Sequence, residues 1–285
     1  MNYIYMCFLL ICIFFTIIIT LKIRTEEKFY EFLNEVNFEQ YKLSDIKKHL
    51  NIETNRLKTI PLVISINVFE KPHFLLKQLD NIRKYVKIDY IIILNCNDYM
   101  LNVLHQYNLP SNVHVNPVFI NKRRYHGSLL EGIISNMKMS LSNYEFKYFL
   151  ILSSRTFFYN YILDESEFKK HIFRNHLKLN KKENFTHRKW KYTKLYEYVL
   201  KNRLYFSTSR HEGLCFDYET CFKLLWFFEI NPYIFDNLIT FAYCVEEFGL
   251  QTICSNLNLP YFNINNDQKS KQCDIYKLTN QIIRK

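Results

Sequence analysis

The chain contains little glycine, proline or alanine. Its 285 residues include only 4 Gly, 6 Pro and a single Ala, Ala242. These counts exclude collagen-like, coiled-coil, proline-rich and Gly/Ser-linker proteins. With 48% hydrophobic and 17% aromatic residues, the chain is also too apolar for a disordered protein. One large domain with attachments is therefore the expected organisation.

Several catalytic and cofactor-binding motifs are also absent. The four glycines are isolated, so there is no GxGxxG motif and no P-loop, and the chain has neither HExxH nor GxSxG. None of the 8 cysteines forms a C-x-x-C pair, which argues against a zinc site. No Asp-x-Asp is present to hold a divalent ion against a diphosphate. We therefore predict no metal site, and expect Lys and Arg to neutralise any bound diphosphate.

The charge balance is strongly basic. Lys+Arg 38 against Asp+Glu 27 gives a net charge of +11, which favours anionic surroundings such as phosphates, acidic glycans or anionic lipid. The abundance of Asn, Ile and Lys is typical of an AT-rich genome, so codon bias accounts for part of this excess. The basic run Lys122-Arg123-Arg124 lies beside Tyr125, but no nucleic-acid-binding motif accompanies it. We expect a solvated loop there and no nucleic-acid partner.

The N-terminal segment has the properties of a membrane anchor. Residues 3–21 contain no charged side chain, and their 19 residues approach the roughly 20 needed to span a bilayer. A cleaved signal peptide is the alternative, but its basic leader and small-residue cleavage site are missing. We therefore predict a single-pass signal-anchor over residues 1–23, followed by a polar stem with short helices over 24–58.

From residue 59 onward, β-branched runs alternate with amphipathic segments. Strands are predicted at 62–68, 90–96, 113–118 and 147–153, with helices at 72–86, 98–107 and 128–142. Because the strands are apolar on both faces, the pattern favours a sheet covered by helices on both sides. Ligands of such sheets bind at the carboxyl ends of the strands.

The second half of this domain, which extends over 59–285, is less regular. A basic aromatic tract covers 187–206. After it we predict a strand at about 203–208 and helices at 217–229 and about 236–256.

Two segments carry candidate chemistry. A buried strand leads directly into Ser153-Ser154-Arg155, whose hydroxyls and guanidinium suit a sugar or a phosphate, although a strand end with a surface arginine is an equal alternative. Glu246 and Glu247 are adjacent carboxylates at a predicted helix start, where they also favour the helix dipole. Such neighbours point about 100° apart, so one can face a cleft while the other is solvated.

Taken in order, five segments resemble the core-2/I-branching β-1,6-N-acetylglucosaminyltransferase family, which is related to the peptide O-xylosyltransferases. They are IPLVISINVFEKPHFLLKQLDNI with YIIILNCND, NVHVNPVFINKRRYHGSLLEGIISNMKMSL, YFLILSSRTFFYN, Arg188-Lys189-Trp190-Lys191, and EEFGLQTI at 246–253. The likeness covers about residues 60–256. It implies an α/β fold with a GT-A-like mixed sheet flanked by helices on both sides. It also implies an inverting, metal-independent transfer of a sugar, such as GlcNAc or xylose, from a UDP-sugar to a glycan or protein hydroxyl.

The resemblance also assigns roles to individual residues. Glu247 corresponds to the catalytic base of the family. The donor contacts that it implies are Ser65, Asn67, Asn95, His126, Gly127, Ser153, Ser154, Arg155, Lys269 and Lys271. The acceptor contacts are Arg188, Lys189, Trp190 and Glu246. No cofactor is implied besides the UDP-sugar substrate.

Three departures from the family lie near the implied donor site. His126 replaces a tryptophan, Asn95 replaces an aspartate, and Ser154-Arg155 replace Gly-Gln. They motivate an alternative hypothesis, in which the protein is a membrane-anchored glycan-binding protein that kept the fold and lost catalysis.

The side of the membrane that holds the domain is left open. Lys22, Arg24 and Lys28 follow the uncharged segment 3–21 and favour a cytosolic domain, whereas the resemblance implies a lumenal one of the Golgi or ER type. The six cysteines beyond the anchor are compatible with either disulfides or buried thiols. The glycosylation sequon Asn184-Phe185-Thr186 matters only for a lumenal domain.

Overall fold

The structure is a computed structural model that describes residues 42–52, 58–68, 71–123, 126–154, 156–158, 161–162, 190–202, 204, 206–207, 211–263 and 275–277. These all belong, apart from Lys42, to one unit, Leu43–Lys285. None of the helices in these ranges combines the length and the hydropathy of a membrane span. The predicted anchor at 3–21 and the sequon at 184–186 lie outside those ranges.

The centre of the fold is a six-stranded mixed sheet with the order β3-β2-β1-β4-β6-β7. Four strands are parallel, namely β1 (Lys58–Val68), β2 (Tyr90–Cys96), β3 (Val113–Val115) and β4 (Tyr144–Ser153). Two are antiparallel, β6 (Leu214–Asp217) and β7 (Tyr261–Asn263). The register pairs Ile64 of β1 with Ile92 of β2 and Leu150 of β4. A second, two-stranded sheet joins β5 (Thr156–Phe158) to β8 (Ile275–Lys277).

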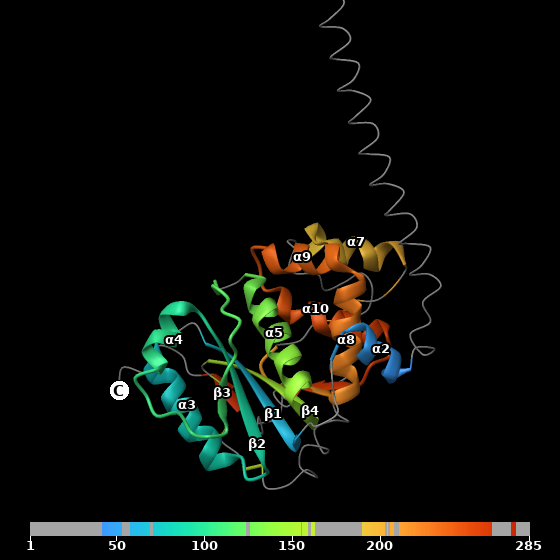
Figure 1. Ribbon diagram of the computed structural model, residues 1–285. Coiled ribbons are helices and arrows are strands. Elements are labelled where there is room, and N and C mark those ends of the chain that lie inside the picture. The colour runs from blue at the N-terminus through green and yellow to red at the C-terminus, as the bar shows by residue number, and fades with distance from the viewer. Residues whose placement is uncertain are drawn as a thin grey trace, which may run out of the picture. The chain divides into compact units, whose positions relative to one another are not determined.

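Helices cover both faces of the large sheet (Figure 1). Helices α3 (Pro72–Tyr85) and α4 (Asp98–Leu104) share a buried apolar cluster with the side chains on one face of β1. Helix α5 (Ser128–Asn143) packs on the other face, where Asn136 donates a hydrogen bond to Ser65 Oγ at 3.0 Å. Because side chains alternate along a strand, β1 is buried on both faces.

The remaining helices lie on the α5 side of the fold. Helix α8 (Tyr218–Ile230) contacts β4, β6 and α5. Around it lie α2 (Leu43–His49), α7 (Lys194–Lys201), α9 (Pro232–Thr240), α10 (Gly249–Asn256) and the 3₁₀ turns η2 (Trp190–Tyr192) and η3 (Val245–Glu247). Helix α2 falls within the segment predicted as a stem. It packs on α8, and its Ile46 is buried.

The predicted α/β alternation is confirmed, and the sheet is mixed and covered on both faces as expected. The strand predicted at about 203–208 is wrong as far as this segment is described, since Leu204, Phe206 and Ser207 belong to no strand. The missed strand is β6, whose position beside β4 depends on long-range pairing. A short apolar run does not reveal which neighbour it will pair with.

The single helix predicted at about 236–256 is also wrong, because the segment forms α9, η3 and α10. Pro232 starts α9 earlier than predicted. The break comes at Phe241, which has an extended backbone (φ −73°, ψ 131°) and whose carbonyl accepts a hydrogen bond from the Gly127 N–H at 2.9 Å. A tertiary contact therefore replaces helix continuation at this point.

The strand order places a topological switch point between β1 and β4. From β1 the chain moves outward through β2 and β3, and it then returns across α5 to add β4 on the other side of β1. The next strand of this sheet after β1 is β2, on one side, and the next after β4 is β6, on the other side. Ligands of open α/β sheets bind at such a point.

Candidate functional site

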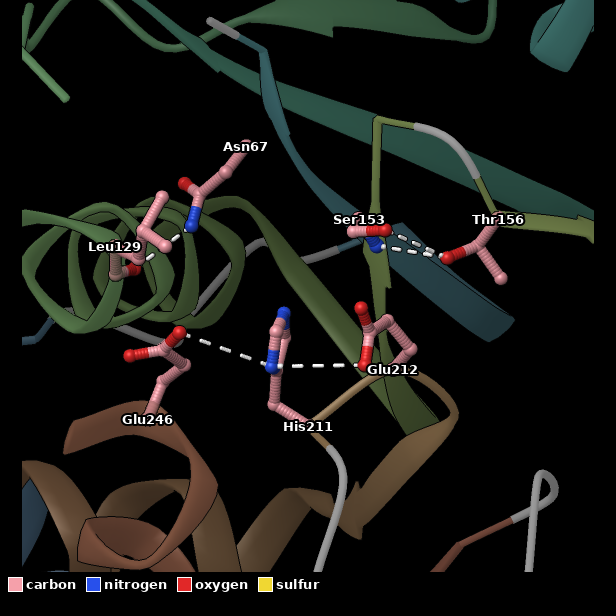
Figure 2. A network of polar contacts seen from close by, with 7 residues as sticks. All are labelled: Asn67, Leu129, Ser153, Thr156, His211, Glu212 and Glu246. Carbon is pink, nitrogen blue, oxygen red and sulfur yellow. Dashed lines mark hydrogen bonds and ion pairs between the residues drawn. The ribbon is translucent and has the colours of Figure 1, made fainter. Parts of the chain in front are cut away.

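The carboxyl ends of β1 and β4 carry Asn67 and Ser153 (Figure 2). Asn67 donates a hydrogen bond from Nδ2 to the Leu129 carbonyl of α5 at 2.7 Å. The Ser153 hydroxyl shares a hydrogen bond with the Thr156 hydroxyl at 2.9 Å. Gln78 of α3 donates to the carbonyls of both Ser153 and Thr156 at 2.7 Å. These bonds hold the two strand ends to the helices on either face of the sheet.

A histidine between two carboxylates lies beside these strand ends, and we call His211, Glu212 and Glu246 the His211 cluster. His211 Nδ1 is 3.7 Å from Glu212 Oε2 and 3.9 Å from Glu246 Oε1. The side chains of Glu212 and Glu246 are only 7% and 2% exposed, whereas that of His211 is 12% exposed. The imidazole is thus the most accessible of the three groups.

Two segments far apart in the sequence form the His211 cluster. Residues His211 and Glu212 directly precede β6, and the Gly213 N–H donates to the Ile151 carbonyl of β4 at 2.8 Å. Gly213 has a φ of 85°, a conformation that favours glycine and turns the chain into β6. Glu246 comes from η3, which contacts α5 and α10. Both carboxylates therefore sit on elements that are packed against the sheet or its helices.

Sequence reasoning missed His211 and Glu212. The available signal was His-Glu-Gly directly before the apolar run Leu-Cys-Phe, a turn at the start of a strand. A turn of this kind indicates a functional position only when a strand is predicted after it, and β6 was not predicted. A histidine and carboxylates at this position can hydrogen-bond hydroxyl groups and can accept or donate a proton.

The predicted base Glu247 and its neighbour Glu246 occupy the same 3₁₀ turn but differ in burial. Glu246 is 1% exposed, whereas Glu247 is half-buried. One of the two neighbouring carboxylates is thus almost completely removed from water, and the other is partly exposed.

A second polar cluster lies at the carboxyl end of β2. Lys122 Nζ donates to Asn95 Oδ1 and to the Ile120 carbonyl, the latter at 3.3 Å. Asn95 Nδ2 donates to the Val118 carbonyl at 3.0 Å. Burial lowers the pKa of Lys122 to about 8, although Cys96 and Glu131 act in the opposite direction. The cluster ties the end of β2 to the segment that follows β3.

The other predicted donor contacts that are described are also held within the protein. Ser65 is 1% exposed and bonded to Asn136, and Ser154 is 2% exposed. His126 Nδ1 accepts a hydrogen bond from the Ser128 N–H at 3.1 Å, at the start of α5.

At Gly127 an added Cβ would lie 1.8 Å from the Leu238 carbonyl oxygen, so this glycine allows α5 and α9 to meet. Its role in packing is independent of any ligand.

Among the predicted acceptor contacts, Trp190 is buried next to the residue that follows η3. Its ring packs on Phe248, which directly follows η3, with ring centroids 4.6 Å apart, and the side chain is 5% exposed. Arg155, Arg188, Lys189, Lys269 and Lys271 lie outside the described residues. Among the residues that are described, no group of three or more His, Cys, Asp or Glu side chains is arranged to hold a metal ion.

The comparisons with known proteins assign the chain to no family. No family model matches it, and no curated protein matches it significantly.

Proposed function

We propose that this protein is an inverting, metal-independent glycosyltransferase with a GT-A-like fold, related to the core-2/I-branching enzymes. It transfers a sugar such as GlcNAc or xylose from a UDP-sugar to a glycan or protein hydroxyl. The observation that carries the proposal is the group of carboxylates beside the carboxyl end of β4, next to a switch point in a sheet of order β3-β2-β1-β4. The sequence resemblance supports the same function.

In this proposal Glu247 is the general base. The acceptor oxygen attacks the anomeric carbon, its proton passes to the Glu247 carboxylate, and the bond from the anomeric carbon to the UDP oxygen breaks. Lys and Arg side chains stabilise the departing diphosphate. Glu247 is favoured over Glu246 because a half-buried carboxylate can meet a substrate hydroxyl, whereas Glu246 is buried against His211.

The test is transfer activity of the full chain with a panel of UDP-sugars, with and without excess EDTA. Glu247→Gln is expected to lower kcat by about 10²- to 10⁴-fold, because it removes the base, while UDP binding is retained. The matched control is Glu197→Gln, an exposed glutamate paired with Lys194 at 2.7 Å, which should leave kcat unchanged. Undiminished activity of Glu247→Gln would reject its role as base, and loss of activity in EDTA would reject the metal-independent scheme.

A second candidate is a glycan-binding protein with the same fold and no catalysis. One observation favours it. The Asn95 side chain, which replaces a family aspartate, accepts a hydrogen bond from Lys122 and donates one to the Val118 carbonyl. Both polar atoms of the Asn95 side chain therefore already form hydrogen bonds within the protein, so neither is available to a nucleotide without breaking one of them. Calorimetric titration separates the two candidates, since the binding protein should bind glycans and show no affinity for UDP.

A further inference from the structure

Lys122 is the first residue of the basic run 122–124, which the sequence predicts to be a solvated loop. That prediction is wrong for Lys122, which is only 9% exposed, whereas its neighbour Arg123 is exposed. The buried ammonium donates to two neutral oxygens, Asn95 Oδ1 and the Ile120 carbonyl. Because an ammonium group has three N–H donors, one donor is left without an acceptor among the described residues.

The charge of Lys122 is poorly compensated. Among the residues that the structure describes, none forms an ion pair with Lys122 or Arg123. The groups whose charge acts on Lys122 are Cys96 of β2 and Glu131 of α5. Burial raises the pKa of both, although Lys122 acts against this at each of them, as does His126 at Glu131. Burial still lowers the pKa of Lys122 to about 8, so the protein alone does not balance this charge.

The contacts of Lys122 place it at the edge of the sheet where ligands bind. Asn95 is next to the last residue of β2, so its hydrogen bond holds the ammonium at the carboxyl end of that strand. A Cβ added at Gly132 of α5 would lie 2.8 Å from Lys122 Cε. The Arg123 N–H donates to the Ser128 hydroxyl at the start of the same helix, at 3.0 Å. Two cations therefore lie between β2 and α5, one buried and one exposed.

We propose that Lys122 and Arg123 form an anion site at the carboxyl end of β2, which binds a phosphate group of the nucleotide-sugar donor. The remaining N–H of Lys122 and the planar guanidinium of Arg123 are donors that suit phosphate oxygens. A phosphate fits better than a neutral oxygen, because it supplies the negative charge that the buried ammonium lacks. The identity of the anion as the donor diphosphate rests on the proposed function, whereas the anion site rests on the contacts of Lys122.

The site is tested by calorimetric titration of the full chain in detergent with UDP, uridine and pyrophosphate. In Lys122→Met we expect the Kd of UDP and of pyrophosphate to rise about 10- to 100-fold, because a charge-assisted hydrogen bond is lost. The Kd of uridine should stay unchanged. The matched control is Lys138→Met, at an exposed lysine of α5, which removes the same charge and should leave all three Kd values unchanged.

Proton uptake is a second readout, which a loss of packing would not mimic. Since the pKa of Lys122 is about 8, about half of the free chains lack this proton at pH 8. A bound anion retains the proton, so UDP binding should take up about 0.5 proton more in the wild type than in Lys122→Met. Calorimetry in buffers of different ionisation enthalpy measures the difference. Arg123→Gln should weaken UDP binding without changing the uptake, because arginine stays protonated.

The wild type provides the same test without any substitution. Its affinity for UDP should fall about tenfold between pH 8 and 9.5, as Lys122 loses its proton in the free chain. This measurement decides the matter even where Lys122→Met does not fold, which circular dichroism and urea unfolding of each variant establish.

Several results would overturn the anion site. They are equal UDP affinity of the wild type and Lys122→Met, an equal loss for uridine and UDP in that variant, equal proton uptake by both chains, and a wild type that binds neither UDP nor pyrophosphate. If the wild type binds UDP through Lys122 but transfers no sugar, the proposed function fails and the anion site stands. If it transfers sugar with a UDP affinity independent of Lys122, the function stands and the anion site fails.

Discussion

At the scale of single residues, Lys122 shows how burial changes the chemistry of a side chain. Its ammonium group is enclosed by Asn95 and the Ile120 carbonyl, and the residue is only 9% exposed. Removing water from a lysine favours its neutral form, so the pKa falls from 10.5 to about 8. Burial acts on Cys96 in the opposite sense and raises its pKa to about 11, because the charged form of a thiol is the deprotonated one.

The lowered pKa of Lys122 predicts a pH-dependent stability. Between pH 8 and 10.5 the unfolded chain holds a proton on Lys122 that the folded chain lacks, so this group makes the free energy of unfolding rise with pH. Relative to Lys122→Met, the wild type should gain about 1.5 kcal/mol between pH 8 and 9.5. Urea unfolding of both chains at these two pH values measures the gain. A constant difference between the chains would contradict the lowered pKa.

At the scale of elements, the contact between α5 and β1 depends on a glycine. A Cβ added at Gly132 would lie 2.2 Å from Asn67 Oδ1 and 2.8 Å from Lys122 Cε. Asn67 is 7% exposed and bonded to Leu129 of the same helix, so it has little room to move. Gly132 therefore lets α5 approach the ends of β1 and β2, where both polar clusters lie.

We expect Gly132→Ala to lower the free energy of unfolding by about 1 to 3 kcal/mol, because the added methyl group overpacks this contact. Gly249→Ala is the matched control, since its Cβ would meet only Leu130 and Leu238 at 3.8 Å. In the first turn of α10 this change should be neutral or stabilise by up to about 1 kcal/mol. Urea unfolding compares the two variants, and equal effects would refute the packing argument.

At the scale of the whole molecule, the interior is rich in thiols. Five cysteines of the described residues are buried thiols that are not in disulfides, namely Cys96, Cys215, Cys221, Cys244 and Cys254. For these five, the structure selects buried thiols from the two alternatives that the sequence left open. Cys273 lies outside the described residues. Burial raises the pKa of Cys215, Cys221 and Cys254 well above the usual value.

These five thiols should resist alkylation by iodoacetamide at pH 8 in the folded protein and react in urea, because the reactive species is an exposed thiolate. Mass spectrometry of peptides from the two conditions measures the modification at each cysteine. Since none of the five is predicted to be bridged, adding a reductant should not change the outcome. Modification of any of them in the folded state would contradict the burial described here.

The sequence by itself determined the alternation of strands and helices from β1 to β4 and the position of polar residues at the strand ends. Strand β2 was predicted with its observed bounds, and Asn67, Ser153 and Glu246 do lie around the two strand ends. These features follow from apolar periodicity, which is local to each segment. Periodicity failed at β6 and at the break between α9 and η3, where pairing and packing with distant segments decide the conformation.

Only the tertiary structure decided which side chains meet. His211 and Glu246 come from different segments, and no spacing in the sequence relates them. Their approach depends on the hydrogen bond of Gly213 to β4 and on the packing of η3 against α5. The order of strands and the register of a sheet arise from long-range burial and hydrogen bonding, so a cluster built at the ends of several elements becomes visible only in three dimensions.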